Sequence, residues 1–198
     1  MKVNRSNLIS IVSLIVTLFL NTGCTYVLNI TETPALQMGS PLRSVEPKTF
    51  AFRDFQDIRG VEDPSLMIKI GFSTHSLDQP PAIFIADRIK KEFERNGHKC
   101  VDASSKAKAD FIVDGKIYKM SFQNIHGTWI MTQIAKAGVK LTINRVPSES
   151  GVFEKSYEGE YTSKSAILTG IAEKLGQAAL SMIKDISTDP ELIEFLKK

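Results

Sequence analysis

A strict alternation of apolar and polar residues in the second half of the chain constrains the fold most. Ala137, Val139, Leu141 and Ile143 alternate with Gly138, Lys140, Thr142 and Asn144. Successive side chains of a strand point to opposite faces, so this pattern predicts a strand with one buried face. Strand-like runs cover residues 110–123, 128–146 and 153–162, with turns at 124–127 and 147–151. Together they predict a meander of three long antiparallel strands.

Two helical patterns supply apolar faces that can cover this meander. After a candidate N-cap at Thr162–Ser163, apolar residues recur at steps of three and four at Ile167, Ile171, Leu175, Ala178, Met182 and Ile186. An earlier amphipathic helix is predicted to begin at Pro80–Pro81 and to end at Asn96–Gly97. Asp189 followed by Pro190 predicts the start of a short last helix. Small residues in the long pattern indicate close packing against a neighbour.

The remaining runs complete a two-layer α+β domain. Strand composition is found at residues 49–55, 66–72 and 98–101, and a further short strand is allowed at 26–30. We predict a mostly antiparallel sheet with a long C-terminal meander and with helices packed on one face. The single domain is expected to span residues 48–198, after a loop-like segment.

The first residues carry a different signal. Lys2 and Arg5 precede an apolar run at residues 8–20, and Cys24 closes the segment after small residues. This arrangement is typical of a secretory signal peptide over residues 1–23, because the apolar run is shorter than the roughly 20 residues of a membrane span. The segment resembles a bacterial lipobox, whose cysteine becomes the lipidated N-terminus, although Asn21 stands where leucine is usual. Plain secretion and an uncleaved anchor are the alternatives.

A lipidated Cys24 would make the membrane the first partner of the chain. Acyl groups such as palmitate would hold the protein in the bacterial cell envelope, with the periplasmic side of the outer membrane as the expected location. Residues 24–47 are expected to form a flexible tether behind this anchor. The formal net charge of +3 falls to +1 when Lys2 and Arg5 are removed, which together with this location argues against nucleic acid as a partner.

The sequence shows no recognisable catalytic or metal-binding motif. It has no glycine-rich phosphate loop, nucleophile elbow, paired cysteines or zinc-protease signature. His75, His98 and His126 lack metal-ligand spacing, and the acidic residues within 54–63 do not follow a calcium-loop pattern. Cys100 is expected to be a buried small side chain, with a reactive thiol as the alternative. We therefore predict no catalytic residues, cofactor or metal.

The bulkiest residues at a predicted turn form the candidate binding site. Phe122 lies before the turn at 124–127, and Trp129, Ile130 and Met131 follow it. Within the strand before this turn, Phe111, Val113 and Ile117 fall on one face, whereas Tyr118, Met120 and Phe122 fall on the other. Exposed apolar patches often bind partners, and tryptophan is frequent in binding hot spots. The alternative, which the sequence favours, is that Trp129 packs under the long helix or at the twist of the hairpin.

Several short stretches resemble the YajG-type family of uncharacterised bacterial lipoproteins. They are Ala86-Asp87-Arg88-Ile89 through Asn96-Gly97, Ala109-Asp110 with Gly115, Ala135 to Val139, and Ile183 to Ile186 with Pro190 to Lys197. The resemblance covers residues 66–198. It implies an envelope lipoprotein of α+β fold without an assigned activity, and therefore no functional residues to transfer.

Three functions follow from these observations. The first is a non-enzymatic envelope module, tethered through Cys24, that binds an envelope protein or helps to assemble a complex. The second is an accessory lipoprotein of a lipid or lipopolysaccharide transport complex, and the third is a periplasmic enzyme. A flat apolar patch at the hairpin would favour the first, a groove between helix and sheet the second, and a cleft with clustered histidines and carboxylates the third.

Overall fold

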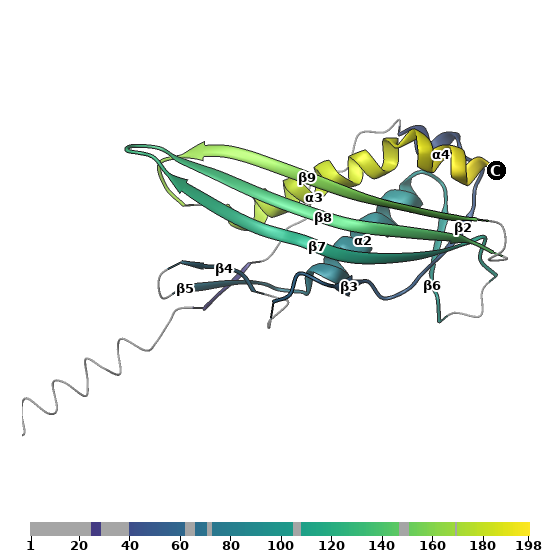
Figure 1. Cartoon of the computed structure of the whole chain (residues 1–198), viewed down its shortest axis with the longest axis horizontal. Coiled ribbons are helices and arrows are strands. Elements are labelled where there is room, and N and C mark those ends of the chain that lie inside the picture. The colour runs from purple at the N-terminus through teal and green to yellow at the C-terminus, as the bar shows by residue number, and fades with distance from the viewer. Residues whose placement is uncertain are drawn as a thin grey trace, which may run out of the picture.

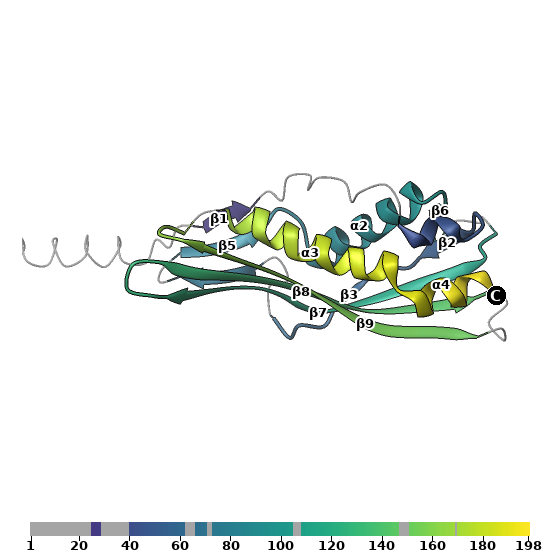
Figure 2. The same cartoon turned by 90° about the horizontal axis from the view of Figure 1, so that it is seen from above.

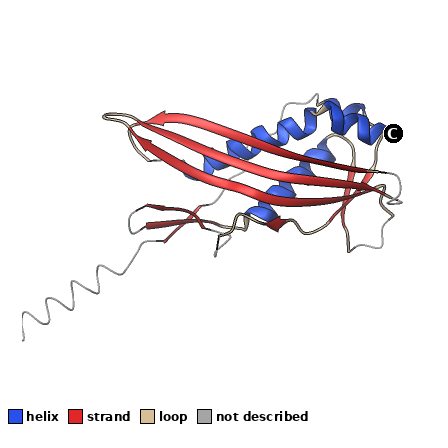
Figure 3. Ribbon diagram, in the orientation of Figure 1, coloured by secondary structure: helices blue, strands red, loops and turns tan. Residues whose placement is uncertain are grey.

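The computed structural model describes residues 25–28, 40–61, 66–70, 73–104, 108–146, 151–168 and 170–198. The predicted signal peptide, Cys24 and residues 147–150 of a predicted turn lie outside the described residues. The predicted two-layer α+β arrangement is confirmed, because the helices pack on one face of a sheet built around three long strands (Figures 1 and 3).

The main sheet combines the predicted meander with parallel strands at one edge. Its strands are β2 (Thr49–Phe52), β3 (Gln56–Asp57), β6 (Lys99–Asp102), β7 (Phe111–His126), β8 (Met131–Arg145) and β9 (Val152–Ser165). Their order is β6-β2-β7-β8-β9, and β3 also pairs with β7. β7, β8 and β9 are antiparallel, whereas β2 is parallel to both β6 and β7. The parallel edge was not predicted from the sequence.

A second, smaller sheet joins the first described residues to the middle of the chain. It contains β1 (Thr25–Leu28), β5 (Ser73–Leu77) and β4 (Leu66–Ile70), in the order β1-β5-β4. β1 is parallel to β5, and the backbone N–H of Asp78 donates to the carbonyl of Leu28 at 3.1 Å. The C-terminal part of β5 is a strand where the sequence predicted the start of a loop. The difference arises because pairing with two other strands holds this segment in the strand conformation. The local sequence of such a short strand gives no strong signal by itself.

Within the described residues, three α-helices cover the main sheet, and the second of them begins later than predicted. They are α2 (Pro81–Arg95), α3 (Ile171–Thr188) and α4 (Pro190–Lys197). α2 and α4 agree with prediction, and Gly97 takes the expected left-handed conformation with φ 93°. The predicted N-cap at Thr162–Ser163 is wrong, because β9 stays paired with β8 as far as Ser165. α3 instead starts after Gly170, whose φ is 62°.

A β-bulge in β7 keeps its apolar residues on the buried face. The pairing with β8 shifts between Ile117 and Lys119, so one extra residue enters the strand there. Met120 and Phe122 therefore face the core like Ile117, and each is at most 4% exposed. The prediction that the two ends of this strand bury opposite faces is wrong for these two residues. Tyr118 lies on the other face, with its ring over Gly138.

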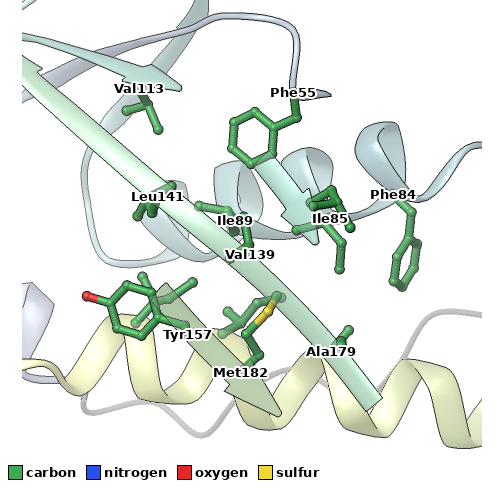
Figure 4. Packing of buried hydrophobic residues seen from close by; sticks show 14 of the residues in the cluster. Phe55, Phe84, Ile85, Ile89, Val113, Val139, Leu141, Tyr157, Ala179 and Met182 are labelled. Atoms are coloured by element: carbon green, nitrogen blue, oxygen red, sulfur yellow. The ribbon is translucent and has the colours of Figure 1, made fainter. Parts of the chain in front are cut away.

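The core lies between the main sheet and the helices. Figure 4 shows Val139 and Leu141 of β8 and Tyr157 of β9 packing beside Ala179 and Met182 of α3. α3 lies very close to β9, since a Cβ atom added at Gly159 would be 2.0 Å from the carbonyl oxygen of Ala178. Only glycine fits this helix–strand contact without displacing backbone.

The domain begins before residue 48. A short 3-10 helix, η1 (Pro41–Ser44), buries Leu42 completely, and Val45 after it is 3% exposed. The Ser40 hydroxyl donates to the carbonyl of Ser187 at 2.8 Å. Residues 40–47 therefore belong to the domain, whereas the sequence placed them in a tether. The predicted tether is interrupted again at β1, which agrees with the short strand allowed at 26–30.

The face of the main sheet opposite the helices is polar, and we call it the outer face. Three ion pairs cross its strands: Lys119–Glu158 at 3.0 Å, Lys136–Glu160 at 3.0 Å and Lys140–Glu154 at 2.7 Å. These side chains are partly exposed, so each pair adds little stability, on the order of 0–1 kcal/mol. The outer face is therefore the solvent-exposed side of the antiparallel meander.

Candidate functional site

Exposed apolar side chains gather where β7 turns into β8. We call residues 125–131 the hairpin tip. Trp129 is 87% exposed, and Ile125 and Ile130 are 55% and 54% exposed. The turn is closed by a 3.1 Å hydrogen bond from the Gly127 N–H to the Ile130 carbonyl. Large apolar side chains with this exposure in a turn mark a surface that another molecule can cover.

The structure places Trp129 outside the core. β7 ends at His126 and β8 begins at Met131, so the turn comprises residues 127–130 and not the predicted 124–127. Trp129 and Ile130 thus lie within the turn itself. The packing role that the sequence favoured for Trp129 is wrong, because the hairpin tip projects past the start of α3 (Figure 2).

The other two predicted contact residues lie below the surface of the hairpin tip. Phe122 is 4% exposed and belongs to the core, so it supports the hairpin from within. Met131 is half-buried, and its sulfur accepts a hydrogen bond from the Asn124 side-chain amide at 3.2 Å. The structure thus brings Trp129 and Ile130 of the predicted set to the exposed surface.

Two further isoleucines at this end were not singled out from the sequence as contact residues. Ile125 is one of them, and Ile167, which follows β9, is 64% exposed. Ser165 pairs with Met131, and the Gln133 side-chain amide donates to the Ile167 carbonyl at 3.0 Å, which places Ile167 near the base of the hairpin tip. Ile167 was assigned to the buried face of the long helix, and only the later start of α3 reveals its exposure.

The sequence around the hairpin tip contains no carboxylate. Residues 115–148 and 161–172 include neither Asp nor Glu, whereas Lys164 lies on β9 near the hairpin tip. The nearest acidic residue along β9, Glu160, forms an ion pair with Lys136. The hairpin tip and the adjoining strand ends therefore combine apolar side chains with Lys164, and the next exposed carboxylate beyond β9 is Glu173 in the first turn of α3.

Cys100 has the properties of a structural residue. It lies half-buried in β6, and its thiol donates to the Lys90 carbonyl at 3.6 Å. Burial and the nearby Glu94 carboxylate raise the pKa of Cys100 to about 12. The thiolate is the nucleophilic form of cysteine, so this thiol is poorly suited to covalent catalysis at neutral pH.

The three histidines occupy different parts of the fold. His98 is 4% exposed, and its Nδ1 accepts a hydrogen bond from the Lys48 N–H at 3.3 Å. Burial lowers the pKa of His98, so it is held neutral inside the domain. His75 lies half-buried in β5, and His126 is exposed at the end of β7. Among the residues that the structure describes, no three His, Cys, Asp or Glu side chains are grouped so that they could hold a metal ion.

An open groove of about 520 Å³ lies between α2 and the ends of β2 and β6. Its basic residues are already engaged: Arg53 pairs with Asp114 at 3.4 Å, and Lys90 pairs with Asp102 at 2.6 Å. Lys90 donates to Asp102 and holds the pKa of that carboxyl below its usual range. Asp87 of the lining also pairs with Lys91 at 3.0 Å, whereas Asp54 is an exposed carboxylate just beyond the end of β2.

Comparison with known proteins supports the fold alone and shows neither a family nor an activity. Neither a family model nor a curated protein sequence matches the chain. Protein XCC0632 of Xanthomonas campestris, from family DUF330, is similar in structure, with a TM-score of 0.57 and 11% identity over 86% of this chain and 96% of that one. The resemblance to the YajG-type family stays a prediction.

Two weaker structural similarities involve other bacterial proteins. A PelC dodecamer subunit of Paraburkholderia phytofirmans has a TM-score of 0.43 and 12% identity, over 80% of this chain and 96% of that one. Lipoprotein GNA1162 of Neisseria meningitidis has a TM-score of 0.38 and 7% identity, over 70% of this chain and 99% of that one.

Within the described part of the chain, no helix has the length and apolar character needed to cross a membrane.

Proposed function

We propose that this chain is a lipid-anchored protein of the bacterial cell envelope that acts as a non-enzymatic binding or assembly module. The observation that carries the proposal is the segment that ends at Cys24. Basic residues, a short apolar run and a cysteine after small residues are the parts of a lipoprotein signal. The lipid would hold the mature protein at a membrane, with the periplasmic side of the outer membrane as the expected location.

The features of the folded domain favour a binding module rather than an enzyme. The thiol of Cys100 is kept protonated, His98 is buried and neutral, and the basic residues of the groove beside α2 are engaged in ion pairs. The most distinctive exposed surface is instead the hairpin tip, with Trp129 at its end. Exposed aromatic and aliphatic side chains on a hydrogen-bonded hairpin suit contact with another surface.

The alternative role in lipid or lipopolysaccharide transport requires a place for the lipid. A groove between α3 and the sheet would have supplied it, but this interface is filled. Leu175, Ala178 and Met182 of α3 are 0% exposed, and they pack on β8 and β9. A transport complex could still use the protein for assembly through its surface. We therefore favour the binding or assembly module.

The test of the proposal is the cellular location of two cysteine variants. Cys24→Ser removes the acceptor for the lipid, so we expect the protein to move from the membrane fraction to the soluble fraction after cell lysis. Cys100→Ser is the matched control and should stay with the membranes, because Cys100 lies inside the domain. Membrane retention of the Cys24→Ser protein, measured by fractionation and immunoblotting, would refute the lipid anchor.

A further inference from the structure

The first described strand lies toward the same end of the molecule as the hairpin tip. β1 and the hairpin tip are found toward one end of the long axis in both views, whereas the C-terminus lies at the other end (Figures 1 and 2). β1 is fixed there by parallel pairing with β5 from Thr25 to Leu28. Leu28 also packs against the core of the domain. The first described residues are therefore attached to the domain in the half of the molecule that contains the hairpin tip.

Covalent geometry then limits the distance between the lipid and the domain. Cys24 directly precedes Thr25, and consecutive Cα atoms are about 3.8 Å apart. A lipid on Cys24 would therefore enter the bilayer next to the start of β1, without an intervening tether. The end of the domain that contains β1 and the hairpin tip must then lie close to the membrane surface.

The hairpin tip has the chemistry of a membrane-interface contact. Trp129 offers a large apolar ring with one N–H donor, and such side chains prefer the boundary between headgroups and acyl chains. Ile125 and Ile130 add aliphatic surface on the same turn, and each is more than half exposed. Burial of apolar surface at the interface is the main source of binding for such elements.

The charges around the hairpin tip also suit contact with a membrane surface. The absence of carboxylates from residues 115–148 and 161–172 removes the groups that anionic headgroups repel most. Lys164 near the end of β9 can face the phosphates of the headgroups. The carboxylates of β9 that do face solvent, such as Glu158 and Glu160, lie farther along the outer face and pair with lysines.

From these observations we infer that the hairpin tip inserts Trp129 and its neighbouring isoleucines into the lipid surface to which Cys24 is anchored. This inference rests on the proposed function, because the anchor selects the membrane as the surface that this end faces. The lipid and the hairpin tip then form two contacts with one bilayer. Two contacts would fix the orientation of the domain, with its long axis directed away from the membrane.

Trp129 is itself the probe for this inference, since it is the only tryptophan in the chain. The lipidated full chain is reconstituted into protein-free vesicles of phosphatidylethanolamine and phosphatidylglycerol, with or without bromine on the acyl chains. Flotation of the vesicles reports the anchor, and Trp129 fluorescence reports the hairpin tip. We expect the protein to float, its emission to move to shorter wavelength, and bromine to quench most of the intensity.

Two sets of variants show whether the apolar side chains cause this insertion. Ile125→Ser combined with Ile130→Ser should reduce bromine quenching severalfold while flotation stays unchanged. Val152→Ser is the matched control, because Val152 is 59% exposed at the opposite end of β9 and should leave quenching unaltered. All three positions are exposed, so the far-ultraviolet circular dichroism should not change.

The readouts separate failure of the inference from failure of the proposed function. A protein that floats while Trp129 stays fully quenchable by aqueous acrylamide and insensitive to bromine overturns the insertion and leaves the anchor in place. If Trp129 becomes shielded only in vesicles that contain envelope proteins, the hairpin tip binds a protein and not the lipid. A protein that does not float overturns the anchor and the insertion together.

Discussion

Replacing Gly159 by alanine is expected to lower the free energy of unfolding by about 3 kcal/mol, at the upper end of the usual cost of overpacking. The added Cβ would lie 2.0 Å from the Ala178 carbonyl oxygen and 2.5 Å from the Met182 backbone nitrogen. Both atoms belong to the backbone of α3, so the helix would have to move away from β9. Urea unfolding followed by circular dichroism measures the loss.

Gly138→Ala is the matched comparison for this prediction. Gly138 lies on β8, and its added Cβ would meet the ring of Tyr118 at 2.9 Å and the Cβ of Lys119 at 3.0 Å. The ring is on the partly exposed outer face and can shift, so we expect a smaller loss than at Gly159. Equal stability of the Gly159→Ala protein and the wild type would contradict the close contact of α3 with β9.

The second large effect is expected at Asp189, which joins β9 to the last two helices. Its carboxylate accepts hydrogen bonds from the Tyr157 hydroxyl at 2.5 Å and the Glu191 N–H at 2.9 Å, and it pairs with Lys155 at 3.0 Å. Asp189→Ala removes the N-cap of α4 and leaves the buried Tyr157 hydroxyl without its acceptor. Together these losses should cost about 3 kcal/mol of unfolding free energy.

The pH dependence of this contribution follows from the pKa of Asp189. Burial alone would raise this pKa, but the hydrogen bonds from Tyr157, Lys155 and the Glu191 backbone hold it below the ordinary 3.8. A lowered pKa in the folded state stabilises the protein above the unfolded value, and this stabilisation is lost as the pH falls through the folded value. The difference in stability between wild type and Asp189→Ala should therefore shrink in acid.

An exposed aspartate on α3 provides the control for Asp189. Asp185 is exposed, so Asp185→Ala should change the unfolding free energy by less than about 0.5 kcal/mol, as is usual for surface substitutions. Thermal unfolding at neutral pH compares the two variants. A similar small change for both would mean that the contacts of Asp189 with Tyr157 and α4 do not stabilise the fold.

Local patterns in the sequence predicted the elements that carry strong periodicity. The alternation from Ala137 to Asn144 predicted β8, and the helical spacing from Leu175 to Ile186 predicted α3. Capping residues set boundaries where their chemistry is specific, as at Asp189 and Pro190. Hence the long meander, its helical cover and the two-layer arrangement could all be predicted.

Features that depend on pairing between distant segments could not be predicted. The bulge between Ile117 and Lys119 is defined by the pairing of β7 with β8. The strand conformation of β5 likewise depends on its pairing with β1 and β4. The continued pairing of β9 to Ser165 likewise overrides the N-cap signal at Thr162–Ser163. In each case the backbone hydrogen bonds to a partner strand decide the structure over local propensity.

The candidate site shows the same limit. The sequence identified bulky residues at the hairpin, but whether Trp129 is buried depends on how far α3 extends over the sheet. That extent follows from the late start of α3 after Gly170, which leaves the hairpin tip uncovered. Phe122, four residues earlier than His126, is buried because the bulge returns it to the core.

Mass spectrometry of the N-terminal peptide of the protein isolated from the membranes of its own host tests the lipid anchor most directly. We predict a mature chain that starts at Cys24 and carries a thioether-linked diacylglycerol, with a further acyl group on the amine. A peptide that starts at Met1, or a Cys24 without lipid, would contradict the anchor, and with it the orientation inferred for the hairpin tip.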